Sequence, residues 1–374
     1  MDPHNLSTAL TKPVATQLEM LGTQTMDQGS NDACEARGAS VLSGSIATKL
    51  DSLCKPPGSL GHLETIAAQL CHVQQTLNPV THPRHATIFA ADHGVTVEGV
   101  SAWPSTITGG VVKVMQSGRS ASGVFAKSLE CGYEVVDVGL LSPVIADRNA
   151  EPSAARRRGT GNILREPAMS EADFDHCWEE GIRRAQRACD AGCVLLIGGE
   201  MGIGNTTSAS CLIGLLTDAT AAEIVGRGAG LDDSGLARKH RVVAATIERV
   251  RSLGIATPKE IAVQVGGLEI VALAGFFFGG AQRGATLLID GLIATSAALI
   301  ASAIEPSVQG HMIAGHRSTE PGHVAALQHL HLHPLLDLQM RLGEGTGALA
   351  ALPLLDLAAV MLRDMATLDE LQLP

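Results

Sequence analysis

Five short apolar runs, separated by longer segments with helical spacing, constrain the fold of this chain more than any other feature. Most are rich in Val, Ile or Leu and lead into Gly-containing turns, which is typical of buried parallel strands. Helices are predicted between them, for example from the Ser170 cap to Gly192 and from Leu236 to Gly254. Strands that alternate with helices predict an α/β fold with a parallel sheet. The runs are ATIFAA at 86–91, EVVDVG at 134–139, CVLLIGG at 193–199, AVQVGG at 262–267 and ATLLIDG at 285–291.

Charge and composition limit the partners of such a fold. The 374 residues carry 27 Lys and Arg against 38 Asp and Glu, a formal net charge of −11, and residues 156–158 form the only basic run. Nucleic acid is therefore disfavoured as the main partner, because no basic stripe is available to neutralise phosphates. Hydrophobic residues make up 45 % and charged residues 17 %, which predicts broad buried surfaces and is compatible with a subunit interface.

Targeting features point to the cytoplasm. Eight cysteines are scattered without a CxxC pair, which favours reduced thiols over a disulfide scaffold. The N-terminus has no apolar signal core, and the longest apolar stretch, 292–304, is too short to span a bilayer. Residues 1 to about 40 are polar and lack periodicity, so we expect a poorly ordered extension. Together these features predict a soluble cytoplasmic protein with no membrane segment.

Polar residues bracketed by glycines follow the predicted strands, at the sheet edge where α/β folds bind ligands. The clearest stretch, GGEMGIGNTTSAS, covers 198–210. Gly202 and Gly204 let backbone N–H groups approach an anion, while Asn205 and Thr206 can cap the next helix and donate hydrogen bonds. The stretch lacks the GK[ST] of a P-loop and the third glycine of a dinucleotide fingerprint. It predicts a phosphate cradle, with an ordinary strand-to-helix turn as the alternative.

A second glycine-rich stretch, GRGAGLDDSGLARKH, starts at Gly226 and leads into a helix that carries Lys239. A lysine near a glycine loop can complete a phosphate site as a point charge. The alternative is that this lysine lies on a solvated helix face.

Glu344 stands in GEGTG, just before a predicted apolar helix. Flanking glycines allow close approach to a ligand, and a carboxylate held there can take a proton from a bound substrate. In the alternative interpretation, Thr346 is the helix N-cap and Glu344 is an exposed charge favoured by the helix dipole.

Trp103 follows the first predicted strand within VSAWPSTIT, in a chain with only 2 % aromatic residues. A flat aromatic next to Pro104 suits a flat heteroaromatic substrate. The alternative is that Trp103 packs in the core or at a dimer contact.

His329, His331 and His333 alternate, as metal ligands on one face of a strand do. Pro334 and the lack of an adjacent carboxylate or Cys argue against a metal site. We interpret the three as surface histidines and expect no metal ligands.

An ordered series of motifs resembles the nicotinate-nucleotide–dimethylbenzimidazole phosphoribosyltransferase family. The resemblance covers about residues 45 to 366. It includes KPPGSLGHLE, ADHGVTVEGVSAWP, VVDVG, GTGNI with EPAMS, GGEMGIGNTTSAS, GRGAGLDDSGLARK, VGGLEIVALAG, LLIDG, GHRSTEPGH and RLGEGTGALA.

The resemblance implies a reaction in cobalamin synthesis: nicotinate mononucleotide and 5,6-dimethylbenzimidazole give α-ribazole 5′-phosphate and nicotinate, with no cofactor. It also implies a homodimer with a Rossmann-like parallel α/β domain at about 80–320. A smaller helical part would come from about 41–80 and 321–374.

The family's catalytic carboxylate falls on Glu344, which would accept the proton that the benzimidazole ring loses as it attacks the ribose. An ordinary glutamate pKa would suffice, because such a group is ionised at neutral pH. We group Asn205, Thr206, Gly345 and Thr346 with the substrate contacts. By resemblance, phosphate and ribose contacts fall on Glu200, Gly202, Ile203, Gly204, Gly228, Lys239 and Ser318, and the base pocket on Ser101, Trp103 and Leu342.

Two other functions are alternatives to this one. A nicotinamide-dependent oxidoreductase would need a dinucleotide fingerprint and an acidic ribose ligand about twenty residues later, which 198–210 does not supply. A catalytically silent nucleotide-binding regulator predicts loss of the carboxylate, yet Glu344 and its glycines are present.

Overall fold

The computed structural model describes residues 32–142 and 154–371. Most of the expected N-terminal extension lies outside the described residues, although helix α2 (Asp32–Ser52) begins within its last part. Two compact units divide the chain. One comprises His82–Leu352, and the other comprises Met1–Thr81 with Pro353–Pro374. The division after residue 352 falls later than the boundary near 321 that the resemblance implies.

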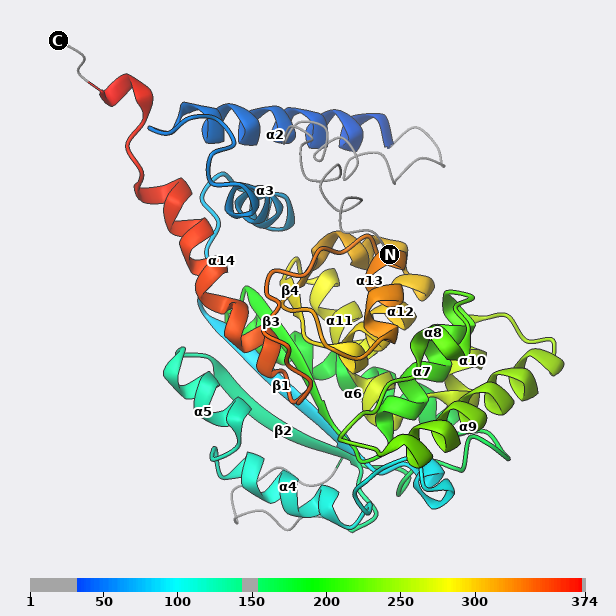
Figure 1. The fold of residues 1–374 in the computed structure, drawn as a ribbon. Coiled ribbons are helices and arrows are strands. Elements are labelled where there is room, and N and C mark those ends of the chain that lie inside the picture. The colour runs from blue at the N-terminus through cyan, green and yellow to red at the C-terminus, as the bar shows by residue number, and fades with distance from the viewer. Residues whose placement is uncertain (1–31, 143–153, 372–374) are drawn as a thin grey trace. The chain divides into compact units, whose positions relative to one another are not determined.

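Five parallel strands form the sheet of the larger unit, in the order β2-β1-β3-β4-β5 (Figure 1). Strand β1 therefore lies between β2 and β3. The connection after β1 leads toward one edge of the sheet, and the connections after β2 lead toward the other edge, so the strand order changes direction between β1 and β3. Ligands of such sheets bind at this point, outside the carboxyl ends of the strands. The strands are β1 (Arg84–Ala91), β2 (Gly132–Gly139), β3 (Leu195–Met201), β4 (Thr286–Ile289) and β5 (Met312–Ala314).

Helices flank this sheet, and the two predicted in detail are confirmed. Helix α6 (Glu171–Asp190) starts at a capping box between Ser170 and Asp173, and α9 (Asp233–Ser252) is capped by Asp232. The others in the larger unit are η2 (Gly94–Glu98), α4 (Ile107–Gln116), α5 (Ala121–Ser128), α7 (Asn205–Leu216), α8 (Ala221–Ile224), α10 (Pro258–Val265), α11 (Leu268–Gln282), α12 (Leu292–Ile304), η3 (Pro306–His311) and α13 (Gly322–His329).

One predicted strand is wrong, and one observed strand was not predicted. The run AVQVGG lies in helix α10, not in the sheet. The reason lies upstream, where Thr257 and Glu260 form a capping box and Pro258 occupies the first turn. The run is apolar because its residues in α10 are buried, so its hydrophobicity does not require a strand. The fifth strand is instead β5, whose three residues are too few to give a periodic signal.

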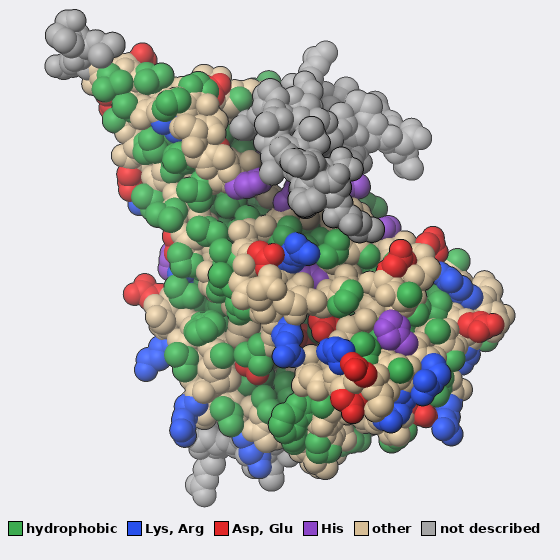
Figure 2. All heavy atoms as spheres, in the orientation of Figure 1, with side chains coloured by type: hydrophobic (Ala, Val, Ile, Leu, Met, Phe, Trp, Pro, Cys, Tyr) green, Lys and Arg blue, Asp and Glu red, His purple; other side chains and the backbone are tan. Residues whose placement is uncertain are grey.

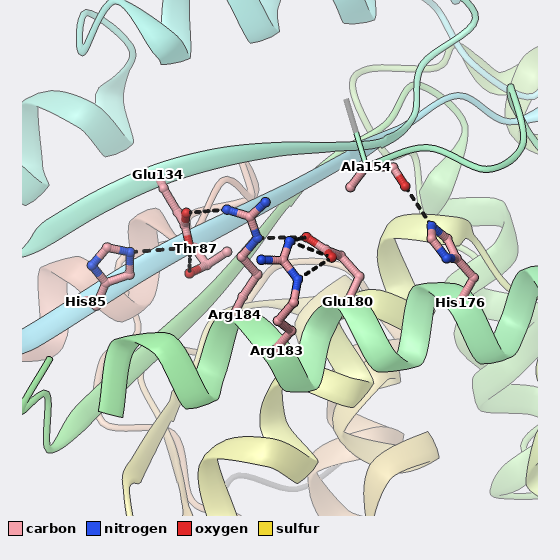
Figure 3. Close-up of polar contacts among 8 residues, drawn as sticks. All are labelled: His85, Thr87, Glu134, Ala154, His176, Glu180, Arg183 and Arg184. Carbon is pink, nitrogen blue, oxygen red and sulfur yellow. Dashed lines mark hydrogen bonds and ion pairs between the residues drawn. The ribbon is translucent and has the colours of Figure 1, made fainter. Parts of the chain in front are cut away.

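A polar network ties helix α6 to strands β1 and β2 (Figure 3). Glu134 accepts from Thr87 at 3.0 Å and from Arg184 at 2.9 Å, and it lies 3.6 Å from His85. Arg184 also donates to Glu180 at 2.7 Å. Burial alone would raise the pKa of Glu134, but His85 and Arg184 outweigh it and lower that pKa to about 2. The network joins the amino-terminal halves of β1 and β2 to α6 and so holds this part of the scaffold together.

The smaller unit contains α2, α3 (His62–Gln74), η4 (Leu368–Glu370) and the end of α14 (Thr346–Asp364). Lys55 pairs with Glu64 at 2.9 Å, and Thr81 donates to Asp356 at 2.6 Å. By length and composition α14 is apolar enough to cross a membrane, and it is longer than the stretch expected from the sequence. However, 61 % of its apolar window is buried, as in a core helix.

Charged side chains are interspersed on the face shown in Figure 2. Lys and Arg side chains alternate there with Asp and Glu rather than gathering into a basic stripe.

Candidate active site

A cavity of about 400 Å³ opens at the carboxyl ends of β1, β3, β4 and β5, within the larger unit. Its wall brings together segments that lie far apart in the sequence. Lys239, Gly345 and Thr346 do not line the cavity. The other residues singled out from the sequence do line it: Ser101, Trp103, Glu200, Gly202, Ile203, Gly204, Asn205, Thr206, Gly228, Ser318, Leu342 and Glu344.

The turn from β3 to α7 forms the floor of this cavity. Gly204 is the N-cap of α7, with a φ of 97° that few other residues adopt. Gly202 is required by close approach, since a Cβ there would lie 2.6 Å from the carbonyl oxygen of Ala91. Both glycines thus leave the backbone bare at the start of a twelve-residue helix, where an anion is stabilised.

Beneath that turn lies a buried group of polar side chains to which the sequence analysis assigned no role. His93 follows β1 in the ADHGV motif and bonds Glu269 at 2.6 Å through Nε2. Its Nδ1 bonds the hydroxyl of Ser208 at 3.1 Å. All three side chains are buried. A Cβ on Gly202 would lie 3.2 Å from the His93 ring, so the imidazole supports the turn from below.

Glu200 is the last but one residue of β3 and is buried in the cavity wall. Burial is the main reason that its pKa is raised to about 8, and the charges of Glu269, Asp290 and Glu344 add to the effect. Asn205 donates a short hydrogen bond to it, which opposes the rise. At neutral pH the Glu200 carboxyl is therefore largely protonated and can donate a hydrogen bond.

The GEGTG loop carries Glu344 into the cavity on a left-handed backbone. Its φ is 62°, and those of Gly343 and Gly345 are 84° and 77°. Asp290, just after β4, fixes the loop by accepting from the N–H groups of Gly345 at 3.2 Å, Gly347 at 2.7 Å and Ala348 at 3.0 Å. The Asp290 carboxylate thus caps the helix α14 that follows.

This geometry rules out the alternative interpretation of the loop. Glu344 is 8 % exposed, so it is not a surface charge. The Thr346 hydroxyl donates to the carbonyl of Gly343 at 2.7 Å, and Asp290 supplies the cap in its place.

The carboxylate of Glu344 sits in a partly apolar environment. Burial raises its pKa above the ordinary range, and the nearby charge of Asp290 adds to the rise. A hydrogen bond from Ser122 opposes the shift. The sequence showed only that an ordinary pKa would suffice for a base, and it does not show how far the loop is buried. A raised pKa makes the carboxylate a stronger base once it is ionised.

Lys239 lies directly behind the cavity wall, not on a solvated helix face. It is fully buried, and its Nζ donates to the Thr206 hydroxyl at 2.8 Å and the Gly226 carbonyl at 3.1 Å. Burial lowers its pKa to about 8. Thr206 and Gly228 line the cavity in front of it. The positive charge of Lys239 therefore acts on the cavity across Thr206 and Gly228.

Ser318 belongs to a tight turn that leads from β5 to α13. The Ser318 N–H donates to Nδ1 of His323 at 2.9 Å, and Nε2 of His323 bonds Thr295 at 2.9 Å. Burial lowers the pKa of His323 to about 3, so the ring is neutral and the hydrogen bonds assign its proton to Nε2. The turn also places Glu320 in the cavity wall, although no sequence pattern assigned this residue a role.

The opposite end of the cavity is more apolar. Trp103 is 52 % exposed and Leu342 is 58 % exposed, and both line the cavity with Ile107 and Val111 of α4. The exposure of Trp103 excludes a place in the core of the larger unit. Helical spacing within α4 places Ile107 and Val111 on one face, a signal that was available in the sequence.

The three alternating histidines lie elsewhere. His329 ends α13, and His331 and His333 are in the following turn, all exposed and not in a strand. The interpretation as surface histidines is confirmed. Among the described residues, the structure has no group of three His, Cys, Asp or Glu arranged to hold a metal.

Known proteins share this sequence and geometry. A phosphoribosyltransferase family model matches residues 39–372. Nicotinate-nucleotide–dimethylbenzimidazole phosphoribosyltransferases of Chromobacterium violaceum and Thermus thermophilus are 47 % and 41 % identical to this chain, over 85 % and 86 % of it and 92 % and 95 % of the relatives. The crystal structure of CobT from Thermus thermophilus matches with a TM-score of 0.84 at 39 % identity, over 88 % of this chain and 98 % of that one.

Proposed function

Since this chain belongs to the nicotinate-nucleotide–dimethylbenzimidazole phosphoribosyltransferase family, we propose that its cavity carries out that reaction with Glu344 as the base. The enzyme transfers the phosphoribosyl group of nicotinate mononucleotide to 5,6-dimethylbenzimidazole in cobalamin biosynthesis. The products are α-ribazole 5′-phosphate and nicotinate. The observation that supports Glu344 most is a buried carboxylate on a glycine-framed loop, lining the cavity. The family match leaves the oxidoreductase and the silent regulator without support.

Proton transfer is the step that needs a positioned side chain. The nicotinate ring nitrogen is cationic in the nucleotide, so it leaves without protonation. The incoming benzimidazole nitrogen forms a bond to C1 of the ribose from the opposite face, and β becomes α. As that bond forms, the N–H at the other ring nitrogen becomes acidic, and Glu344 accepts its proton. Holding both substrates in one cavity supplies much of the remaining rate enhancement.

The ribose and phosphate would occupy the end of the cavity nearest α7. Backbone N–H groups at Gly202, Ile203 and Gly204 are available to phosphate oxygens at the helix N-terminus. Thr206 accepts from Lys239, so its own hydroxyl proton is free to point at the phosphate. Lys239 then contributes charge from behind the wall. Glu200 and Ser318, which both line the cavity, would contact the ribose.

The acceptor base would occupy the apolar end. Trp103, Ile107, Val111 and Leu342 form a wall that suits a flat ring carrying methyl groups. Glu344 lines the same cavity as both groups of residues, as the proposed reaction requires.

The direct test is to mix the protein with nicotinate mononucleotide and dimethylbenzimidazole and to follow free nicotinate by chromatography. We expect release that depends on both substrates. Release without dimethylbenzimidazole would indicate hydrolysis, and no release would contradict the proposed reaction. Glu344→Gln is the matched control, because it keeps the shape of the side chain and removes the base.

Assembly and location are further parts of the proposal. A homodimer would cover apolar side chains that α4 and α5 leave exposed, such as Val114, Val124 and Phe125 at 47 %, 52 % and 37 % exposure. Sedimentation velocity measures this assembly directly, and a monomer at micromolar concentration would contradict it.

A cytoplasmic location is supported by the free thiols of all seven cysteines that the structure describes.

A further inference from the structure

We propose that Glu320 is a positioning residue for the phosphate end of the cavity: it clamps the loop at Gly226–Gly228 and supplies the counter-charge to Lys239. The inference rests on the proposed function, because it assumes that this end of the cavity receives the phosphate of the nucleotide.

Glu320 is buried, and its two carboxylate oxygens play different parts. It is 6 % exposed and lines the cavity. One oxygen, Oε1, accepts from the backbone N–H of Gly228 at 2.9 Å. The other, Oε2, has no hydrogen-bond partner and lies against Gly226, where a Cβ would collide with it. A buried carboxylate oxygen without a partner is costly and needs an explanation.

Lys239 contacts the same loop and carries the opposite charge. Its Nζ donates to the carbonyl of Gly226 and to Thr206, which uses two of its three N–H donors. The loop backbone is therefore held between a carboxylate and an ammonium group. Among the described residues, Glu320 and the thiol of Cys211 are the acidic groups that act on Lys239. Burial raises the pKa of Cys211 to about 12, so Glu320 is the only anion of the two.

The charge of Glu320 matters because Lys239 is close to losing its proton. Burial lowers the pKa of Lys239 to about 8, and Glu320 acts against that decrease. Without the carboxylate, a larger fraction of Lys239 would be neutral at physiological pH. Thr206 would then lose its charged donor, and the cavity would lose positive potential at the point where the phosphate binds.

The test compares Glu320→Gln with wild type on two donors, nicotinate mononucleotide and its dephosphorylated riboside. Gln keeps an oxygen for the Gly228 N–H and removes the charge. We expect the KM for the mononucleotide to rise about tenfold, the effect of roughly one pKa unit, with little change for the riboside or for dimethylbenzimidazole. In wild type the KM for the mononucleotide should begin to rise near pH 8, where Lys239 loses its proton. In Glu320→Gln this rise should begin at a lower pH. Glu179→Gln, on an exposed turn of α6, is the matched control.

Several outcomes would overturn the proposal. An equal loss with the riboside would show that Glu320 contacts the ribose and not the phosphate end. An unchanged mononucleotide KM in Glu320→Gln, alongside a raised KM in Lys239→Ala, would show that Lys239 needs no counter-charge. The double variant should be no worse than Lys239→Ala alone, because both changes remove the same interaction.

Lys239→Ala tests the underlying assignment separately. If that single variant leaves the mononucleotide KM unchanged, the phosphate end is placed wrongly and the proposed function of this end fails. A loss of thermal stability that accompanies equal losses on both donors would mark Glu320 as purely structural, and this too would overturn the inference.

Discussion

The hydroxyl of Ser122 donates a 3.3 Å hydrogen bond to Oε2 of Glu344, across 222 positions of the chain. Ser122 lies in the first turn of α5, fully buried, and its Oγ also bonds the Tyr133 hydroxyl at 2.9 Å. The carboxylate on the cavity loop is therefore held by a helix that does not line the cavity. This contact favours the ionised form of Glu344 and opposes the effect of burial.

Ser122→Ala should move the acid limb of the kcat profile to higher pH. The hydrogen bond lowers the pKa of Glu344, so its loss raises that pKa further. Because the base is active only when ionised, activity would then disappear at a higher pH as the solution is acidified. At alkaline pH kcat should recover. An acid limb that stays in place would show that another group controls it.

Glu344→Gln should fold, bind nicotinate mononucleotide and lose most of its turnover. Removal of a positioned general base typically lowers kcat by about a hundred- to ten-thousand-fold. Steady-state kinetics at saturating substrates measures the loss, and calorimetric binding of the nucleotide checks that the cavity is intact. A near-wild-type kcat would exclude Glu344 as the base.

Glu200→Gln should keep a kcat close to that of wild type at pH 7. The pKa of Glu200 is raised to about 8, so the carboxyl is mostly protonated and Gln reproduces its shape and donor. Glu200→Ala, which removes the donor, should be clearly slower in the same assay. If both variants are equally slow, an ionised Glu200 is required and the raised pKa does not describe the working enzyme.

Asp290→Asn should lower both stability and kcat. Three backbone N–H groups donate to the Asp290 carboxylate. An Asn side chain would turn its NH₂ group toward some of these donors, and two donors cannot form a hydrogen bond with each other. The unsatisfied groups should cost about 1–3 kcal/mol in the free energy of unfolding, measured with urea. Asp51→Asn, on an exposed face of α2, is the control. Wild-type stability in Asp290→Asn would mean that the loop does not depend on this cap.

Trp103→Ala should weaken dimethylbenzimidazole while sparing the nucleotide. The indole is half exposed, so little folding energy is lost, whereas stacking on a bound aromatic ring contributes about 0.5–1.5 kcal/mol. Separate KM values for the two substrates, together with the order of preference among benzimidazole, its dimethyl form and adenine, provide the measurement. A parallel loss of the proposed homodimer would identify Trp103 as an interface residue.

Local sequence signals predicted the scaffold where they were long enough. Helix α6 was predictable because its cap and its apolar spacing agree, and four of the five strands carry buried apolar runs followed by glycine. The run at 262–267 was wrongly predicted as a strand, because a short apolar segment has the same hydrophobic pattern in a buried helix and in a buried strand. In that case Thr257 and Pro258 were the deciding signal.

The glycine loops of the site could be predicted from the sequence, but the residues that hold these loops in place could not. Gly202 and the residues around Glu344 stand out because backbone exposure near a ligand demands glycine. Ser122, Asp290 and Glu320 act through tertiary contacts with segments far away in the chain, and no spacing rule connects them to the cavity.

The order of the strands has a consequence for how such an enzyme can diversify. The wall that would meet the acceptor base comes largely from one stretch, residues 100–111, between β1 and the middle of α4. The parts that would hold the nucleotide come from later stretches of the chain, after β3 and β5. A few neighbouring codons can therefore alter the choice of base while the donor site is inherited unchanged. If the proposed site is right, acceptor preference and donor recognition are separately heritable traits in this architecture.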